Sequence, residues 1–267
     1  MKSHVSLTAL AVALLLGGSL PAQAQFLGIG QPGNGVILLA QSRLRFRVPS
    51  VRSSGSLRSG AARGNCHPEG KPILMVPLLP MTQANGEIQL YPGTTASKHP
   101  RFFVHIPETT AQEARFMVVS QTQRQVIYEE SFSLPGTSGV VEFRLPDTTT
   151  PLAVGESYKW SVELVCDPVD NSGNVAVEGI VQRVETATHW EQVPDRDRPL
   201  AYAQADIWYD AVASLAELRQ TQPNNPAWKT DWRDLLQSVN LNAIADEPLV
   251  SCCQPKNTTS QLGVRGN

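Results

Sequence analysis

The central part of the chain, from Pro72 to about Val184, alternates apolar and polar residues with a period of two. The clearest run has these residues at every second position: Tyr158, Trp160, Val162, Leu164 and Cys166. Lys159, Ser161 and Glu163 lie between them. Successive side chains of a β-strand point to opposite faces, so this pattern predicts an antiparallel strand with one buried face.

The same alternation recurs in six further segments. We predict strands at residues 73–79, 101–106, 115–120, 125–134, 141–145 and 175–184. Turn signals such as Asn85-Gly86 and Pro135-Gly136 separate these segments. Short strands with such turns predict an immunoglobulin-like antiparallel β-sandwich over residues 66–190.

A local motif at the start of the clearest strand supports this prediction. Leu152, Gly155, Tyr158 and Trp160 have the spacing of a tyrosine corner, in which a tyrosine hydroxyl bonds to the backbone a few residues upstream. We therefore expect Tyr158 and Trp160 in the core of the sandwich. Cys166 shares their strand face, so a disulfide at Cys166 should pack into the same core.

Four cysteines fit an oxidising compartment. We pair Cys66 with Cys166, and closing a loop of that length can stabilise the fold by roughly 4–5 kcal/mol. Cys252 and Cys253 are adjacent near the C-terminus. Pairing of these two with the other cysteines remains an alternative, because four cysteines allow three connectivities.

After Val184 the apolar period changes to three and four residues. Apolar residues recur at Leu200, Ala203, Ile207, Ala211, Leu215 and Leu218, which predicts one amphipathic helix of about five turns. A second helix should follow Asn224-Asn225-Pro226 and complete a C-terminal α-helical hairpin over residues 199–250. The positions of Tyr202, Trp208 and Ala211 loosely resemble one tetratricopeptide repeat. One repeat cannot bury its own apolar face, so we expect Trp208 and Ala211 to pack in the structural core.

The first 24 residues have the features of a cleavable secretory signal peptide. Lys2 precedes an apolar run over residues 7–16, and Ala22 and Ala24 form an A-x-A cleavage site before Gln25. The apolar run is about half of the roughly 20 residues that a membrane-spanning helix needs, which disfavours the alternative of an uncleaved anchor. We therefore predict an exported protein, periplasmic or extracellular, that does not span the membrane after cleavage. A second apolar run leaves a later cleavage near Ala40 open.

Residues 25–65 are predicted to form a flexible basic arm. The segment has no Asp or Glu, and it carries six arginines, of which Arg43, Arg45 and Arg47 come first. Such an arm can contact an acidic surface or serve as a solvated linker. The polar residues 251–267 are predicted to form a loose tail.

The sequence contains no catalytic motif that we recognise. The histidines form no metal-ligand pair, His105 is expected to be a core or face residue, and serine-nucleophile motifs are missing. Asp170, Ser172 and Asn174 faintly resemble a calcium loop, but Val181 stands where the final Glu is required, so a hairpin turn is preferred. We expect a non-enzymatic protein with no cofactor and no metal.

Charge and motif context also argue against nucleic acids and nucleotides as partners. The formal net charge of −2 becomes −3 when the signal peptide, with its one Lys and no acid, is removed. A near-neutral balance is unlike that of a nucleic-acid-binding chain. Gly28, Gly30 and Gly33 match the dinucleotide-binding pattern in letters only, because no strand precedes them and no helix follows.

Four segments together resemble a known family. They are Thr95-Ala96-Ser97-Lys98-His99-Pro100-Arg101-Phe102-Phe103, Phe132-Ser133-Leu134-Pro135-Gly136, Tyr158-Lys159-Trp160 with Cys166-Asp167-Pro168, and Ile207-Trp208-Tyr209-Asp210-Ala211. They are similar to those of a cyanobacterial exported family, the domain-of-unknown-function family numbered 928, over residues 71–250. The resemblance implies export and strands followed by helices. It implies no catalytic residues, since the family has no established activity.

We hypothesise an exported, non-enzymatic protein-interaction module of the cell envelope that contacts a protein partner through its helical hairpin. The first alternative is a carbohydrate-binding module, in which Trp190, Trp228 or Trp232 stacks on sugars. The second is a hydrolase whose Ser, His and Asp meet only in space. The sequence predicts no oligomeric state.

Overall fold

The computed structural model divides the chain into Met1–Gln41 and Ser42–Asn267, and the described residues all lie in the second unit. The structure describes residues 44–48, 55–57, 66–67, 69–84, 87–134, 136–186 and 189–251. Outside them lie the predicted signal peptide, the glycine motif of residues 28–33, and the tail after Ser251 with the adjacent Cys252 and Cys253.

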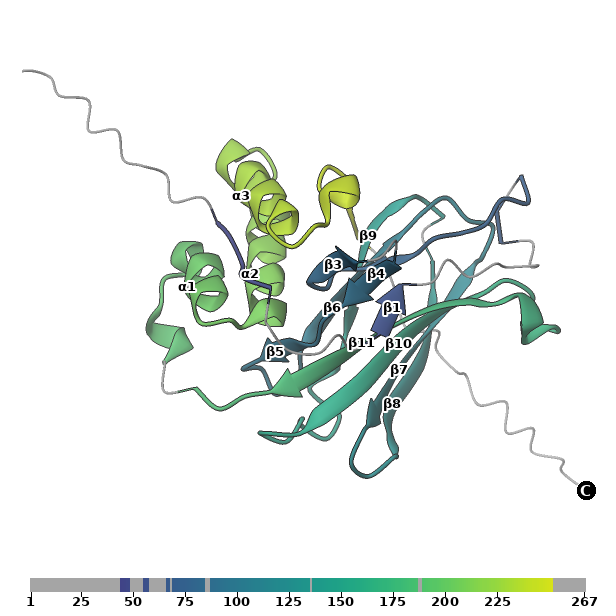
Figure 1. Cartoon of the computed structure of the whole chain (residues 1–267), viewed down its shortest axis with the longest axis horizontal. Helices are drawn as coiled ribbons and strands as arrows, with labels where there is room; N and C mark the ends of the chain where they lie inside the picture. The colour runs from purple at the N-terminus through teal and green to yellow at the C-terminus, as the bar shows by residue number, and fades with distance from the viewer. Residues whose placement is uncertain are drawn as a thin grey trace, which may run out of the picture. The chain divides into compact units, whose positions relative to one another are not determined.

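The larger of two facing sheets has five strands in the order β5-β11-β10-β7-β8 (Figure 1). Their bounds are Gly93–Thr95 for β5, Glu113–Ser120 for β7, Val126–Ser133 for β8, Ser157–Val165 for β10 and Val175–Arg183 for β11. The pairings are antiparallel except that β5 runs parallel to β11 at the edge. In β10 buried and half-buried residues alternate over all nine positions, as the sequence predicted.

The second sheet has four strands in the order β12-β9-β6-β2. Their bounds are Val76–Pro77 for β2, Arg101–Ile106 for β6, Gly139–Arg144 for β9 and Leu249–Val250 for β12. Only β12 runs parallel to its neighbour, β9. The strand predicted over residues 73–79 is wrong outside β2. Pro77 has no N–H to donate, and after it the Leu78 N–H makes one further bond to β6, to the Phe103 carbonyl at 2.9 Å.

Aromatic side chains fill the space between these two sheets. The ring of Phe102, on β6, lies 5.2 Å from Phe116 on β7 and 5.2 Å from Trp160 on β10. Phe143, on β9, lies 5.6 Å from Phe116. All four rings are buried, so the inner faces of both sheets share one core.

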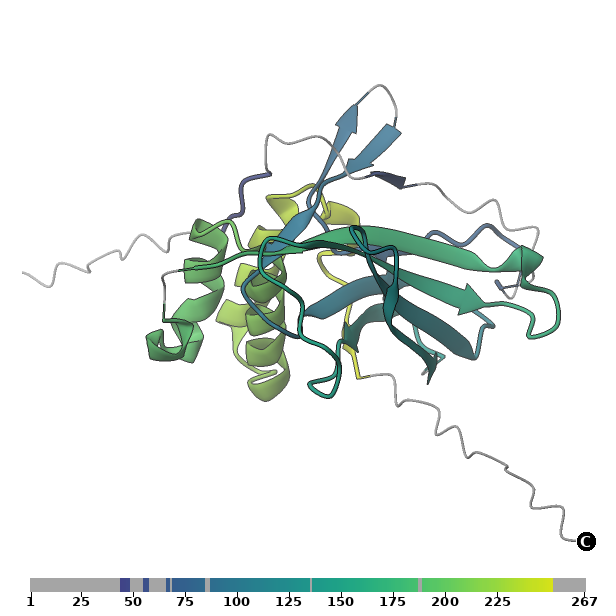
Figure 2. The ribbon, with the colours of Figure 1, turned by 90° about the horizontal axis from the view of Figure 1, so that it is seen from below.

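A third, smaller sheet was not predicted. Its strands are β1 (Gly55–Leu57), β3 (Met81–Ala84) and β4 (Glu87–Leu90), in the order β1-β4-β3. Figure 2 shows the β3 and β4 ribbons, in blue, beside the two main sheets. The hairpin is fixed to the helical region, because Met81 N–H donates to the Val239 carbonyl and the Asn240 amide donates to the Met81 carbonyl.

Three α-helices follow the strands: α1 (Arg198–Gln204), α2 (Trp208–Thr221) and α3 (Pro226–Gln237). The single helix predicted from Leu200 to Leu218 is therefore wrong. The helical region predicted over residues 199–250 is present, but it has three α-helices in place of a two-helix hairpin and ends in β12. The break falls at Asp206, whose φ of +59° is left-handed and cannot continue an α-helix. The Thr94 hydroxyl donates to the Asp206 carbonyl at 2.5 Å and holds the break in place.

Parts of the predicted flexible arm are folded. Leu44 and Phe46 are buried, the Phe46 N–H donates to the Ser238 hydroxyl, and β1 pairs with β4. The arm prediction over residues 25–65 is wrong for these two segments, because Phe46 packs on Trp208 of the helical region and the backbone of β1 pairs with β4. In the part of the chain that the structure describes, no helix has the length and hydropathy needed to cross a membrane.

Candidate functional site

The first turn of α2 packs into the core beside β5, an edge strand of the five-stranded sheet. The Trp160 indole N–H donates to the Tyr209 hydroxyl at 2.6 Å, and that hydroxyl donates to the Ile180 carbonyl at 3.0 Å. Burial raises the pKa of Tyr209 far above its ordinary value, so its hydroxyl remains protonated. Tyr209 therefore connects α2 to both β10 and β11.

Two glycines make room for this contact. A Cβ at Gly93 would lie 2.6 Å from Tyr209 Cε2, and a Cβ at Gly179 would lie 2.6 Å from Trp160 Cε2. Any larger residue would push α2 or the indole out of place. The glycine inside β11 thus serves a close packing contact.

Trp208 anchors the same turn on its other side. Its indole N–H donates to the Leu78 carbonyl at 2.7 Å, and its ring lies 4.8 Å from Phe46 in an edge-to-face contact. Trp208 and Ala211 have no exposed surface, and Tyr158 and Trp160 are also buried. All four residues expected in the core lie there, and they belong to one continuous core.

Asp210 is the most deeply placed carboxyl group of this junction. Its Oδ2 accepts from the Thr95 hydroxyl at 2.7 Å and from the Ala96 N–H at 3.1 Å. Burial raises the pKa of Asp210, while these two hydrogen bonds and the nearby Arg101 act in the opposite direction. The carboxyl group thus fastens the end of β5 to α2.

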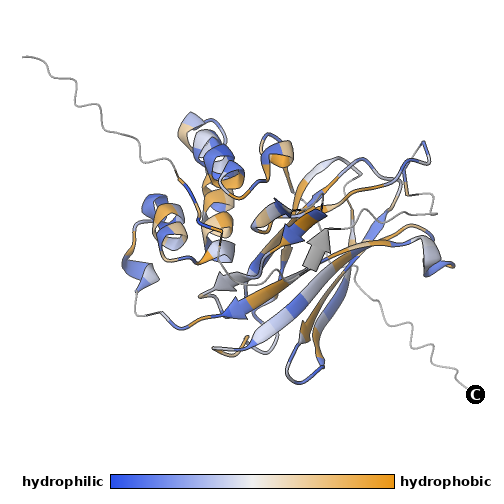
Figure 3. Ribbon diagram, viewed as in Figure 1, coloured by the Kyte–Doolittle hydropathy of each residue, from blue (hydrophilic) through white to orange (hydrophobic). Residues whose placement is uncertain are grey.

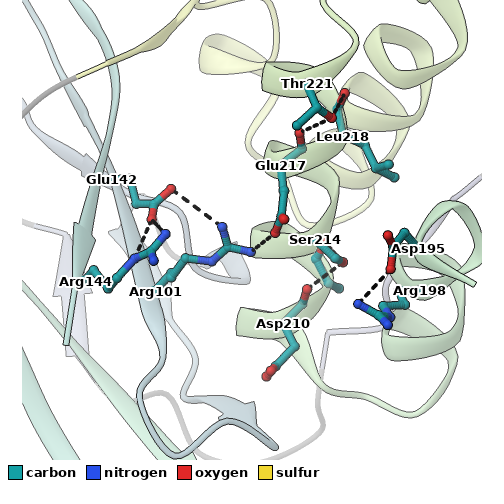
Figure 4. A network of polar contacts seen from close by, with 11 residues as sticks. Arg101, Glu142, Arg144, Asp195, Arg198, Asp210, Ser214, Glu217, Leu218 and Thr221 are labelled. Atoms are coloured by element: carbon teal, nitrogen blue, oxygen red, sulfur yellow. Dashed lines mark hydrogen bonds and ion pairs between the residues drawn. The ribbon is translucent and has the colours of Figure 1, made fainter. Parts of the chain in front are cut away.

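Arg101, on β6, links the four-stranded sheet to the middle of α2 (Figure 4). Its Nη2 donates to Glu217 Oε2 at 2.9 Å, and its Nη1 lies 3.9 Å from Glu142 Oε2. Arg144 holds the other oxygen of Glu142 at 3.0 Å. Opposite charges are paired along this boundary between sheet and helix.

An aromatic pair covers the outer side of the junction. The rings of Trp190 and Tyr202 lie 4.2 Å apart, and burial together with the charge of Asp210 raises the pKa of Tyr202 to about 12. Arg198 donates to the carbonyls of Trp190 and Val193. These contacts hold α1 against the segment of residues 190–193.

Two other predicted features lie near opposite ends of β10. The Ala153 N–H donates to the Tyr158 hydroxyl at 2.9 Å, a bond to the backbone five residues upstream. Cys66 and Cys166 form a disulfide with their Cα atoms 4.9 Å apart. The alternative pairing of these two cysteines with the tail cysteines is not found.

The remaining candidate ligands have structural partners. Asp170 accepts from the Ser172 N–H and Asn174 accepts from the Cys166 N–H, so this segment forms the turn before β11. His105 is buried on β6, with its Nε2 at 3.5 Å from Glu247, and burial lowers its pKa. Among the described residues, no three His, Cys, Asp or Glu side chains are grouped as a metal site would require.

Two open grooves lie along α3, one near each end of the helix. The groove near its C-terminal end has a volume of about 630 Å³ and is lined by Arg45, Phe46, Arg47, Asp234, Gln237 and Ser238. The groove near its N-terminal end has a volume of about 410 Å³, and its lining includes Arg219, Gln222, Asn225, Lys229 and Asp246. Figure 3 shows hydrophilic residues, in blue, along α3. No local pattern in the sequence predicts either groove, because each is lined by separate segments of the chain.

The tryptophans suggested as sugar platforms are mostly engaged elsewhere. Trp232 has no exposed surface, which excludes it from stacking on a sugar. The Trp228 indole N–H donates to Gln222 Oε1 at 3.1 Å. Trp190 is half-buried against Tyr202, as described above.

The fold and its junction can now be compared with known proteins. A family model described as Domain of Unknown Function (DUF928) matches residues 58–249, which is most of the chain. The chain belongs to the DUF928 family. The comparisons with curated proteins and with solved structures found no match.

Two of the segments that carry the DUF928 resemblance meet at the junction. The segment from Thr95 to Phe103 supplies Thr95, Ala96 and Arg101, and the segment from Ile207 to Ala211 supplies Asp210. They bond through Asp210 Oδ2 across more than a hundred residues of sequence. In this DUF928 chain the two motifs therefore hold the helices on the sandwich.

Proposed function

We propose that this protein is an exported, non-enzymatic protein-interaction module of the cell envelope, and that it contacts its partner through α3 and the two grooves beside that helix. The observation that carries the proposal is the separation of two kinds of polar residue. Those at the junction are bonded to one another, whereas those along α3 line open surface grooves.

The junction supports a structural role more than a catalytic one. The carboxylate of Asp210 is occupied by two donors, and the guanidinium of Arg101 is paired with Glu217. A general acid or base needs access to a substrate proton. Neither groove is lined by these three residues.

The position of α3 suits it to contact a partner. Its buried side, with Trp232, Leu235 and Leu236, packs on the protein. Lys229 and Arg233 are exposed on its other side. The helix is therefore held rigidly while its polar side is open to another molecule.

Export to the periplasm or the extracellular space is part of the proposal. It is supported by the signal-like residues 1–24 and by the disulfide between Cys66 and Cys166, since disulfides persist in oxidising compartments. We also propose that the fold of the sandwich is immunoglobulin-like. Its two facing sheets and the Tyr158 bond to Ala153 support this, and the parallel edge strands β5 and β12 are additions to that plan.

Site-specific photo-cross-linking of the full chain in its native host tests the proposal. A photo-reactive amino acid replaces Thr230, which is exposed on α3, and Gln121, exposed at the turn between β7 and β8, serves as the control position. We expect a discrete protein adduct from position 230 and none from position 121. Equal adducts at both positions, or none at position 230, would contradict the proposal. Deleting residues 199–250 is unsuitable, because Trp208 and Tyr209 belong to the core.

A further inference from the structure

The groove near the N-terminal end of α3 contains two cations, Arg219 and Lys229, that form no ion pair among the described residues. Arg219, near the end of α2, faces the ring of Trp232, with its Cζ 4.8 Å from the ring centroid. Its Nη1 is buried and has no hydrogen-bond acceptor in the described part of the chain. Lys229, one turn into α3, is exposed and lines the same groove.

The one acidic residue of this groove, Asp246, lies near Arg219, but its ion pair is with Arg233. Burial lowers the pKa of the Arg219 guanidinium, and the nearby charge of Asp246 acts in the opposite direction. Asp246 Oδ1 accepts from Arg233 Nε at 2.9 Å and from its Nη2 at 2.5 Å. A carboxylate held by a guanidinium in this way competes poorly for a second cation. The lining thus has two positive charges against one negative charge that Arg233 offsets.

A neighbouring amide is also oriented to donate. Gln222 Oε1 accepts from the Trp228 indole N–H at 3.1 Å and from the Asn225 amide at 3.3 Å. With its oxygen so occupied, the NH₂ group of Gln222 remains to donate to a ligand. Arg219, Lys229 and Gln222 therefore present donors to one groove, which is the chemistry that binds a carboxylate.

We propose that this groove binds a carboxylate-bearing segment of a protein partner, held by Arg219, Lys229 and Gln222. The inference rests on the proposed function and adds the chemistry of the partner. The ten lining residues include no aromatic side chain, which disfavours a sugar, and they do include Pro223, Pro248 and Leu249, which can contact apolar parts of a peptide.

The protein's own tail is a poor occupant of this groove. Residues 252–267 carry Lys256 and Arg265 and no Asp or Glu. Like charges would repel the tail from Arg219 and Lys229. An acidic segment of another protein has the required complementarity.

Fluorescence anisotropy with the full mature chain tests the inference. The probe is a short fluorescein-labelled peptide of alternating Glu and Gly residues, capped at both ends, and the reference peptide has Gln in place of Glu. We expect the Glu peptide to bind and the Gln peptide not to bind. Because the contacts are ionic, binding should also weaken at ~0.15 M salt relative to low salt. Inorganic phosphate added as competitor should displace the Glu peptide only weakly.

Substitutions locate the binding. Lys229→Gln, an exposed change, should weaken binding of the Glu peptide several-fold, and Arg219→Gln with Lys229→Gln should weaken it by about tenfold or more. The matched control is Lys159→Gln, which removes the same charge from the five-stranded sheet, where Lys159 pairs with Glu178. It should leave the affinity unchanged.

Equal binding of the Glu and Gln peptides would overturn the inference. So would an equal loss of affinity with Lys159→Gln, or no loss of affinity with Lys229→Gln. Phosphate that displaces the Glu peptide fully would show a general anion site in place of a peptide site. Cross-linking from position 230 does not depend on peptide charge. An adduct there without Glu-peptide binding would therefore leave the proposed function standing and reject the acidic partner.

Discussion

The indole N–H of Trp160 and the hydroxyl of Tyr209 are joined by a buried 2.6 Å hydrogen bond that links the sandwich to the helices. The Tyr209 hydroxyl in turn donates a hydrogen bond to the Ile180 carbonyl of the neighbouring strand. Because the donor, the relay and the acceptor come from β10, α2 and β11, the helices cannot separate from the sheet without leaving buried polar groups unpaired.

Tyr209→Phe tests this link directly. The change keeps the ring and removes the hydroxyl, so the Trp160 N–H and the Ile180 carbonyl lose their partner. We expect the free energy of unfolding to fall by about 1–3 kcal/mol, measured by urea denaturation. Tyr91→Phe is the control, since the Tyr91 hydroxyl bonds Thr82 at a half-buried site. A loss no larger than that of the control would refute the role of Tyr209.

Gly179→Ala should destabilise the protein by crowding the same indole. A Cβ at this position would lie 2.6 Å from Trp160 Cε2, so the ring has to move in a packed core, at a cost of about 1–3 kcal/mol. Glu178→Ala, one residue earlier on the outer face, should cost less than about 1 kcal/mol. Thermal unfolding of both variants gives the comparison, and equal losses would argue against a packing role for Gly179.

Asp210 should make stability depend on pH in a specific direction. Burial raises the pKa of this carboxyl in the folded state, so the folded protein binds the proton more tightly than the unfolded chain does. The contribution of Asp210 to stability is therefore greatest below its unfolded pKa of about 3.9 and is lost as pH rises through the higher folded pKa.

The difference between wild type and Asp210→Asn isolates this effect, because His105, whose pKa is lowered, contributes a slope of the opposite sign. We expect the wild type to lose stability relative to Asp210→Asn as pH rises above about 3.9, in urea denaturation across a pH series. Parallel curves would show that Asp210 does not titrate as described. Asp210→Ala should be worse at every pH, since the Thr95 hydroxyl and the Ala96 N–H would lose their acceptor.

Reduction of the disulfide between Cys66 and Cys166 should destabilise the sandwich. The bond closes a loop with a sequence separation of 100 residues, and replacing both cysteines by Ala should cost about 2–5 kcal/mol. Replacing Cys252 and Cys253 by Ala is the matched control and should leave the melting temperature unchanged. Peptide mapping without reductant should recover the linked peptides of Cys66 and Cys166. A linkage of either one to the tail would contradict the pairing.

The strands were the most predictable part of the fold. The bounds of β6 agree with the predicted residues 101–106, and β10 was placed within one residue at each end, because alternation is a local property of a half-buried strand. The short edge strands β5 and β12 carry no such signal. They have three and two residues and pair in parallel with strands far away in sequence.

The helical region and the candidate site were less predictable. Apolar spacing continues across Asp206, so the sequence pattern could not reveal the break that the Thr94 hydroxyl stabilises. Nor does any local pattern connect Asp210 with Thr95, 115 residues away. The donor set of Arg219, Lys229 and Gln222 likewise forms only when α2 and α3 pack together, and the segment after α3 completes the groove with Asp246, Pro248 and Leu249.

The amino-acid sequence by itself determined the β-rich centre, the helical C-terminal region and the buried aromatic residues, since each depends on local periodicity or on residue type. The pairing of Cys66 with Cys166, preferred from the sequence among three connectivities, was decided by the structure. The tertiary structure alone decided that α2 enters the sandwich, that Phe46 of the arginine-rich segment bonds to Ser238 after α3, and that α3 lines two open grooves. The physical reason is range: periodicity records which side of an element is buried, whereas hydrogen bonds and charges between distant segments exist only after the chain has folded.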